Sequence, residues 1–253
     1  MEIKDQVVLV TGASRGLGAE IAKAFGREGA RVIVNYYQSE QKAQEVAQSI
    51  GDHAIAVQAD ITDKEQVQNM FGQAEQHFGQ AVTTVVNNAL VNFKFDAVNK
   101  KDAKTIAWED YDTQLEGSVK ASLHTTQAAH EGMSRLKFGR IINIGTNLVQ
   151  NPVVPYHDYN TGKAALIGFT RSMARELGVN GITVNMVSGG LLQTTDASAS
   201  TPDEVFELIK ESTPLQRVTT PGELADAVLF FASPWSRAVT GQNLVVDGGL
   251  VMD

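Results

Sequence analysis

Short runs of β-branched and other apolar residues recur along the chain, separated by stretches whose apolar positions repeat with helical spacing. The short runs predict buried strands over residues 7–11, 31–35, 54–58, 82–87, 140–144, 182–187 and 244–246. The intervening stretches predict helices, among them residues 17–25, 65–78, 111–136, 163–177 and 223–231. This alternation predicts an α/β fold, a doubly wound parallel sheet of about seven strands with helices on both faces.

No linker rich in Pro, Gly or Ser divides the chain, and it contains no internal repeat, so residues 1–253 are expected to form one domain. Two segments break the alternation, residues 92–110 and residues 191–214. The first is charged and rich in Lys, and is either a solvated surface loop or a recognition loop. The second includes an amphipathic helix over residues 202–211 and is predicted to be a mobile lid over the substrate opening.

Composition indicates a globular protein and removes several classes of function. Apolar residues make up 43% and charged residues 20% of the 253 residues, which argues against disorder and coiled coil. A net charge of −8 provides no field that attracts phosphate backbones, so nucleic acid is not expected as a partner. The chain lacks Cys, long apolar runs and the blocks of a signal peptide, which predicts a cytoplasmic protein with no membrane partner.

A glycine-rich turn follows the first predicted strand and runs into the first predicted helix. Residues 11–18 read Thr-Gly-Ala-Ser-Arg-Gly-Leu-Gly, with the glycine spacing GxxxGxG. Such a turn either serves strand–helix packing alone or lets the backbone approach a pyrophosphate, whose charge the helix N-terminus meets. The candidate cofactor-binding residues of the turn are Gly12, Ser14, Arg15, Gly16, Leu17 and Gly18.

The end of the second predicted strand indicates which dinucleotide this turn would hold. Many dinucleotide folds place an acidic residue there for the ribose 2′-hydroxyl, whereas residues 35–39 read Asn-Tyr-Tyr-Gln-Ser. No carboxylate repels a 2′-phosphate, and Arg15 can supply positive charge, with Asn35 and Ser39 as hydrogen-bond donors. The sequence therefore predicts NADP(H), with Asn35, Tyr36 and Ser39 as further cofactor-binding residues.

A tyrosine and a lysine four residues apart form a candidate catalytic pair. Tyr159 and Lys163 lie at the start of a predicted helix, where i,i+4 spacing places both on one face. An adjacent ammonium favours the phenolate form, so the pair is a candidate acid–base unit. Thr146 follows the strand predicted over 140–144, where it can hydrogen-bond a substrate carbonyl.

Taken together, these motifs resemble the short-chain dehydrogenase/reductase family in order and spacing. The resemblance covers essentially the whole chain. It rests on residues 11–18, Asp60-Ile61, Asn87-Asn88-Ala89, Thr146, Tyr159-xxx-Lys163 and Gly190-xxx-Thr194. Within the family, the sequence segments at residues 139–145, 181–185 and 247–249 look most like those of the 3-oxoacyl-[acyl-carrier-protein] reductases.

The resemblance implies a Rossmann fold and NADPH-dependent reduction of a ketone, with a 3-oxoacyl thioester as the leading substrate. It implies that Tyr159 protonates the carbonyl oxygen, that Lys163 holds the nicotinamide ribose and lowers the pKa of Tyr159, and that Thr146 orients the carbonyl. It also implies cofactor contacts from Asp60, Ile61, Asn87, Asn88, Ala89, Leu192 and Thr194. A homotetramer and an acyl carrier protein as partner are expected on the same grounds.

Four positions depart from the family pattern, namely Leu90, Ser118, Thr146 and Gly189. Thr146 keeps a hydroxyl in place of Ser, whereas Ser118 stands where the family has an Asn that helps hold a water in the proton relay. Two alternatives therefore stay open: a dehydrogenase of another ketone, sugar or polyol, and an NADP-binding member with weak or lost catalysis. The five His residues show no metal-ligand spacing, so no metal site is predicted.

Overall fold

The computed structural model of the chain describes residues 1–93, 95–96, 99–193, 195, 198 and 201–252, and its centre is a seven-stranded sheet. All strand pairs are parallel, in the order β3-β2-β1-β4-β5-β6-β7. The strands are β1 (Val7–Val10), β2 (Arg31–Tyr36), β3 (Ala54–Gln58), β4 (Thr84–Asn87), β5 (Gly139–Thr146), β6 (Ile182–Gly189) and β7 (Asn243–Val246). The predicted doubly wound α/β fold is confirmed.

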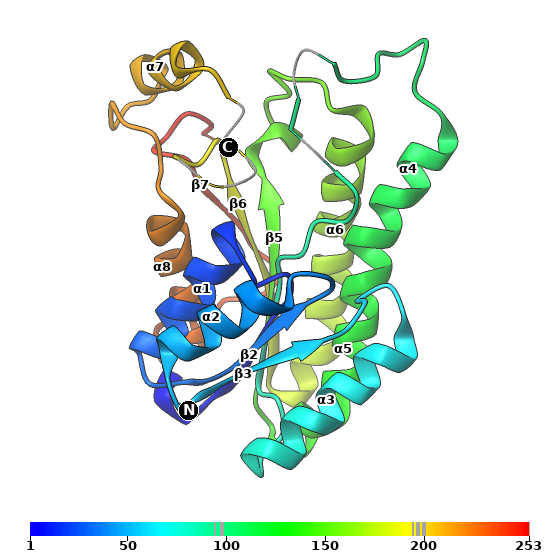
Figure 1. Cartoon of the computed structure of the whole chain (residues 1–253), viewed down its shortest axis with the longest axis vertical. Coiled ribbons are helices and arrows are strands. Elements are labelled where there is room, and N and C mark those ends of the chain that lie inside the picture. The colour runs from blue at the N-terminus through cyan, green and yellow to red at the C-terminus, as the bar shows by residue number, and fades with distance from the viewer. Residues whose placement is uncertain (94, 97–98, 194, 196–197, 199–200, 253) are drawn as a thin grey trace.

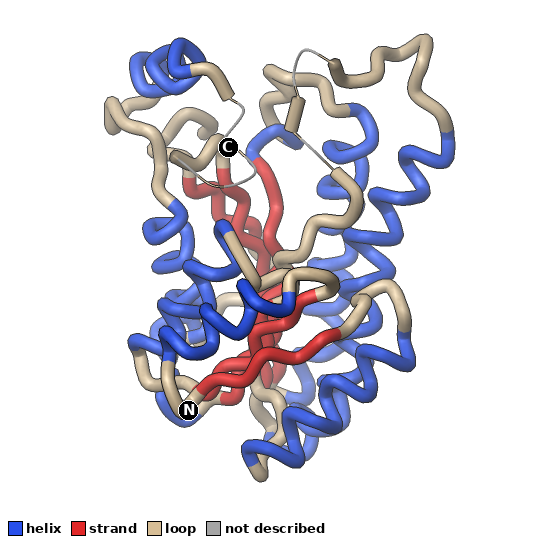
Figure 2. The backbone as a smooth tube through the Cα atoms, viewed as in Figure 1, coloured by secondary structure: helices blue, strands red, loops and turns tan. Residues whose placement is uncertain are grey.

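Helices cover the sheet in two layers (Figures 1 and 2). One face carries α1 (Gly16–Arg27), α2 (Glu40–Ile50) and α8 (Pro221–Ala232). The other carries α3 (Lys64–Phe78), α4 (Trp108–Leu115), α5 (Ala121–Leu136) and α6 (His157–Leu177). Each face therefore has its own apolar core, and the β-branched strands between them are buried on both sides. No helix within the described ranges is long and apolar enough to cross a bilayer.

Two helices differ from the boundaries that the apolar pattern predicts. The helix expected over residues 111–136 is interrupted by a π-helical turn, Glu116–Lys120, which separates α4 from α5. The helix expected from residue 163 begins six positions earlier, at His157, so Tyr159 lies in its first turn. Periodicity marks the apolar face of a helix but reads its ends less well, because the first turn of α6 carries mostly polar residues.

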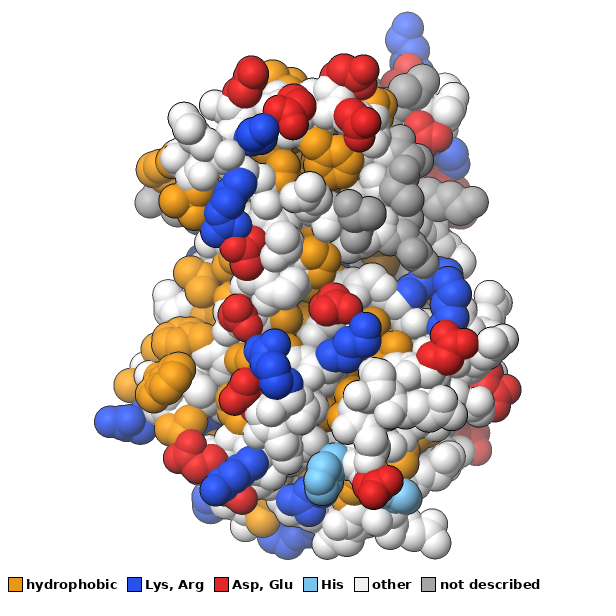
Figure 3. Space-filling model, turned by 60° about the vertical axis from the view of Figure 1, so that its left-hand side comes forward, with side chains coloured by type: hydrophobic (Ala, Val, Ile, Leu, Met, Phe, Trp, Pro, Cys, Tyr) orange, Lys and Arg blue, Asp and Glu red, His pale blue; other side chains and the backbone are white. Residues whose placement is uncertain are grey.

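Helix α7 (Asp203–Ser212) confirms the amphipathic helix expected near residues 202–211, although none of its residues is buried. Its side chain Leu208 is 61% exposed, and acidic side chains gather at this end of the molecule (Figure 3). The apolar stripe of α7 thus lies outside both cores.

The strand order reverses between β1 and β4. From β1 the chain adds β2 and then β3 on one side, and it then crosses to the other side of β1 to form β4. Ligands of such sheets bind outside the carboxyl ends of the strands at this reversal. The segments 92–110 and 191–214 follow β4 and β6, and their described residues lie above that edge of the sheet (Figure 1). The fold therefore brings the two irregular segments to the edge at which a ligand is expected.

Candidate active site

The glycine turn between β1 and α1 has the shape of a phosphate cradle. Gly12 and Gly16 have φ angles of +62° and +55°, a region that favours glycine. A Cβ on Gly12 would lie 2.8 Å from the Cα of Ala89, so a side chain there would close the space. Helix α1 begins at Gly16, and the side chain of its N-cap residue, Arg15, does not cap the helix, so the N-terminus of α1 is suited to an anion. These residues fit a dinucleotide pyrophosphate.

Buried polar side chains hold this turn in place. The Thr11 hydroxyl accepts hydrogen bonds from the amides of Asn88 (2.9 Å) and Ala89 (3.0 Å). Asn35 is 2% exposed; its Oδ1 accepts from the Gly12 amide at 3.1 Å and its Nδ2 donates to the Ala59 carbonyl at 3.1 Å. Asn35 therefore braces the turn from inside, which corrects the expectation that its side chain would meet a 2′-phosphate.

The remaining candidate cofactor residues line the carboxyl ends of β1, β2 and β3. Arg15 is exposed, whereas Ser14, Leu17, Ser39 and Asp60 are partly buried, and Tyr36 and Ile61 are buried. The Asp60 carboxylate accepts hydrogen bonds from the Thr62 amide (2.8 Å) and hydroxyl (2.7 Å), which fixes the loop after β3. The structure thus brings the adenosine-side candidates to one edge of the sheet.

Across the reversal, the predicted catalytic residues come together from β5 and α6. Thr146 is the last residue of β5, and its hydroxyl lies close enough to the Tyr159 phenol to lower the pKa of that phenol. The Lys163 Nζ donates to the Ile144 carbonyl at 2.7 Å and lies 5.8 Å from the centroid of the Tyr159 ring. All three side chains are buried, with exposed fractions of 5–6%.

Burial governs the titration of this pair. Desolvation raises the pKa of Tyr159 to about 12, against a smaller lowering by the adjacent Thr146 hydroxyl. Desolvation also lowers the pKa of Lys163 to about 8. The pKa of Tyr159 is therefore raised overall, because the cost of burying the phenolate outweighs the lowering by the adjacent hydroxyl.

Ser118 lies in the π-helical turn and is 6% exposed. It borders a cavity of about 10 Å³, about the size of one water molecule. The cavity is lined by Thr11, Ile61, Asn87, Ala89, Gly117, Ser118, Ala121, Ser122, Lys163 and Leu166. One cavity with polar and apolar lining therefore borders both Ser118 and Lys163, and π-helical turns are frequent at functional positions.

A chain of buried hydrogen bonds links the helices on either side of this cavity, and the sequence analysis missed it. Asn87 Nδ2 donates to Asn143 Oδ1 at 2.8 Å, and Asn143 Nδ2 donates to the Thr170 hydroxyl at 2.8 Å. The Thr125 hydroxyl donates to Asn87 Oδ1 at 2.7 Å. A fully buried Asn inside the apolar strand β5 was the available signal, because buried polar side chains need partners.

Two aromatic residues of the segment after β4 were also missed. Phe93 stacks on Tyr159, with ring centroids 4.7 Å apart and planes at 19°. Phe95 meets Tyr159 edge-on at 5.2 Å. Their position just beyond the carboxyl end of β4 was the only sequence signal, and nothing in it indicated contact with a residue of α6.

The segment after β6 lies beside the glycine turn. Leu192 forms an isolated β-bridge with Thr219 and packs against the core that includes α1 and α8. A Cβ on Gly16 would lie 3.8 Å from the Thr195 Cβ. Thr194, predicted to bind the cofactor, lies outside the described residues. At Gly189, a side chain would meet Leu224 Cδ1 at 2.5 Å, which accounts for glycine at this position.

A glycine cradle at the strand-order reversal, faced by a buried Tyr–Lys pair, defines a dinucleotide-binding oxidoreductase of the α/β class. Residues 12–251 match the family model described as enoyl-(acyl carrier protein) reductase. The chain is 34% identical to the 3-oxoacyl-[acyl-carrier-protein] reductase FabG of Vibrio cholerae serotype O1, over 100% of both chains. It is also 34% identical to the hydroxynaphthalene reductase-like protein Arp2 of Metarhizium acridum, over 97% of this chain and 95% of Arp2.

Among solved structures, a double mutant of a Serratia marcescens short-chain dehydrogenase/reductase matches with a TM-score of 0.86. Its sequence identity is 31%, and the match covers 99% of both chains. The chain belongs to the short-chain dehydrogenase/reductase family, as its motifs predicted. It is an oxidoreductase that acts on CH–OH groups.

Proposed function

We propose that the protein reduces a ketone to a secondary alcohol with NADPH, and that its substrate is a 3-oxoacyl thioester. The observation that carries the proposal is the proximity of the Thr146 and Tyr159 hydroxyls, with the Lys163 amine buried beside them. Two adjacent hydroxyls can both reach one carbonyl oxygen, which is the atom that receives the proton when a ketone is reduced, whereas the proton goes to a carbon atom when a carbon–carbon double bond is reduced. This favours carbonyl reduction, the chemistry for which the Vibrio relative is named.

In this mechanism Thr146 donates a hydrogen bond to the carbonyl oxygen and Tyr159 transfers its proton to the same oxygen. NADPH supplies the hydride, and with it both electrons, to the carbonyl carbon. The Lys163 ammonium stabilises the phenolate that Tyr159 becomes, and because the pKa of Lys163 is about 8 the ammonium is present at neutral pH. Ser118 and a water in the adjoining cavity would return a proton through Lys163 to Tyr159.

The cofactor assignment uses groups along the whole carboxyl edge. Gly12, Ser14, Gly16, Leu17 and Gly18 would hold the pyrophosphate, and Asn87, Asn88 and Ala89 the ribose of the nicotinamide half. Tyr36, Asp60 and Ile61 would border the adenosine, and Leu192 and Thr194 the carboxamide. Arg15 and Ser39 would bind the 2′-phosphate, supported by the absence of Asp and Glu from residues 35–39. Arg15→Ala should then reduce the preference for NADPH over NADH by about tenfold, since charge-assisted bonds to phosphate are strong.

The thioester and carrier-protein assignments are supported by the names of several relatives, in which 3-oxoacyl-[acyl-carrier-protein] is the substrate. On this chain, Arg135 and Lys137 are exposed at the end of α5 and would contribute to docking an acidic carrier protein. The homotetramer that the family resemblance implies is likewise part of this proposal. Sedimentation velocity tests it, and a monomer would contradict it.

The primary experiment follows NADPH oxidation with the N-acetylcysteamine thioester of acetoacetate. Wild-type protein should turn over, and Tyr159→Phe should lose about 10²–10⁴-fold in kcat. Tyr37→Phe, at a side chain that is 57% exposed, is the matched control and should leave the rate unchanged. NADPH binding without turnover of this thioester would contradict the thioester assignment, and a panel of ketones, sugars and polyols would then distinguish another substrate from lost catalysis.

A further inference from the structure

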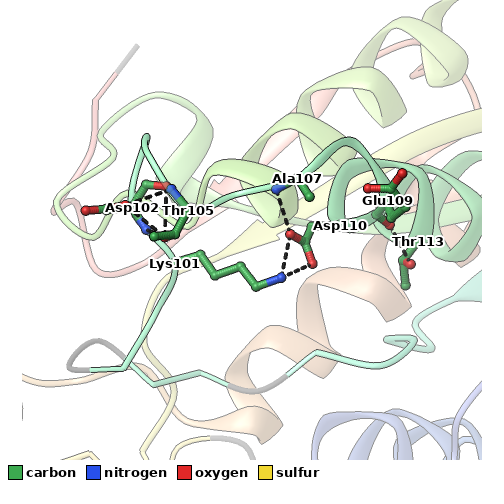
Figure 4. Close-up of polar contacts among 7 residues, drawn as sticks. All are labelled: Lys101, Asp102, Thr105, Ala107, Glu109, Asp110 and Thr113. Atoms are coloured by element: carbon green, nitrogen blue, oxygen red, sulfur yellow. Dashed lines mark hydrogen bonds and ion pairs between the residues drawn. The ribbon is translucent and has the colours of Figure 1, made fainter.

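Between β4 and α4, Lys101 is bound to α4, whereas Phe93 and Phe95 lie against Tyr159 of the active site. At the α4 end, the Lys101 Nζ lies 2.7 Å from both carboxylate oxygens of Asp110, and the same carboxylate accepts from the Ala107 amide at 2.9 Å (Figure 4). Asp102 closes a turn by accepting from Thr105, with hydroxyl and amide contacts of 2.8 and 3.0 Å. The fastened part therefore does not depend on the aromatic residues at the other end.

At that other end, four aromatic rings form one cluster over the start of α6. Phe93 and Phe95 meet edge-on at 5.0 Å, and both contact Tyr156 edge-on, at 5.4 and 5.7 Å. Phe93 also lies flat against Tyr159, whose ring it shields from water. We name Phe93 and Phe95 together the aromatic wall.

The aromatic wall borders the position at which a substrate must react. A carbonyl oxygen that reaches both Thr146 and Tyr159 brings the groups bonded to its carbon next to the rings that cover Tyr159. Phenyl side chains offer flat apolar surface and carry no hydrogen-bonding atoms. They match a flat apolar substituent better than a flexible alkyl chain, which must lose rotational freedom to lie against them, or a hydroxylated chain, which loses its hydrogen bonds to water.

We propose that the aromatic wall selects the substituent on the reacting carbonyl, so that the protein prefers a 3-oxo substrate with an aryl group at this carbon over one with a linear alkyl chain. This inference rests on the proposed carbonyl reduction and names its substrate class. Phe93 and Phe95 act as specificity-determining residues because they would contact the substituent, whereas any effect of Phe93 on the Tyr159 ring that it stacks against applies to both kinds of substrate alike.

The test compares kcat/KM for two thioesters that share one head group, benzoylacetyl- and 3-oxohexanoyl-N-acetylcysteamine. Wild-type protein should prefer the benzoylacetyl thioester. The double variant Phe93→Leu/Phe95→Leu keeps apolar side chains but removes the flat rings. It should lower the ratio of kcat/KM for the benzoylacetyl thioester to kcat/KM for the 3-oxohexanoyl thioester by about five- to tenfold. Phe230→Leu, at a half-exposed ring on α8, is the matched control and should leave the ratio unchanged.

A folded double variant with an unchanged ratio, or with equal losses on both thioesters, would overturn the inference, since rings that only pack the segment would produce that result. Failure of the thioester assignment gives a different result. Wild type would then leave both thioesters unreduced while reducing simple ketones, and the same ratio would be measured with acetophenone and 2-hexanone. Inactivity on both pairs of substrates would overturn the inference and the proposed function together.

Discussion

Lys163 should lower the stability of the folded protein at neutral pH, although the proposed chemistry needs it. Its side chain is 5% exposed, and the Ile144 carbonyl is its hydrogen-bond partner among the described residues. Burial lowers the pKa of its ammonium from 10.5 to about 8, because the charged form loses water that one carbonyl does not replace. Replacing this amine by the apolar side chain of Lys163→Met should therefore stabilise the fold while abolishing turnover.

The size and sign of the effect follow from proton linkage. Between pH 8 and 10.5 the unfolded chain holds a proton on Lys163 that the folded chain has released, so the free energy of unfolding rises with pH in this window. A shift from 10.5 to about 8 in the pKa corresponds to about 3 kcal/mol between the two plateaus. At pH 10 the free energy of unfolding is about 2–3 kcal/mol higher than at low pH, and below pH 8 the full cost of burying the charged Lys163 side chain remains. The raised pKa of Tyr159 acts in the opposite direction only from pH 10 upward.

Urea unfolding of wild type and Lys163→Met at several pH values from 7 to 10 measures the contribution of Lys163 burial to the free energy of unfolding. At pH 7 the variant should be more stable by about 1–3 kcal/mol, the lower figure allowing for the hydrogen bond that the Ile144 carbonyl loses. Towards pH 10 the difference should vanish or reverse. Lys64→Met, at an exposed position on α3, should change neither the stability nor its pH dependence by more than about 0.5 kcal/mol. A stability difference that stays constant from pH 7 to 10 would refute the reasoning.

Two further substitutions test the supports of the site. Asn143→Ala removes two hydrogen bonds from the buried hydrogen-bond network between α5 and α6, and should lower the free energy of unfolding in urea by about 2–4 kcal/mol. Asn69→Ala, at an exposed position on α3, should lower it by less than about 0.5 kcal/mol. Equal losses of stability in Asn143→Ala and Asn69→Ala would contradict the supporting role of this buried hydrogen-bond network. Gly12→Ala should lower stability by about 1–3 kcal/mol and weaken NADPH binding, because φ is +62° and the new Cβ would crowd Ala89. A Cβ on Gly72 would have nothing within 4 Å, so Gly72→Ala should instead raise the free energy of unfolding by about 0.5–1 kcal/mol. A loss of stability in Gly72→Ala equal to that in Gly12→Ala would count against crowding and positive φ as the cause.

The regular part of the fold was predictable from the sequence because its signals are local. A β-branched run such as residues 31–35 suits a strand that is buried on both faces, and a glycine turn before an apolar-periodic stretch is typical of a strand–helix junction. The i,i+4 spacing of Tyr159 and Lys163 placed them on one side of α6 without any tertiary information. The candidate catalytic residues and the doubly wound parallel sheet needed no more than such signals and the resemblance to the family.

Tertiary packing alone decided the environment of those residues. The direction of the Tyr159 pKa shift depends on how deeply the phenol is buried, and this is set partly by Phe93, which lies 66 positions earlier in the chain. Asn35 occupies the strand end at which a ligand contact was expected, yet its side chain turns inward because the Gly12 amide and the Ala59 carbonyl are there to be bonded. A sequence motif identifies which groups can act, but burial and hydrogen bonding arise from segments that are distant in sequence, and no local pattern records them.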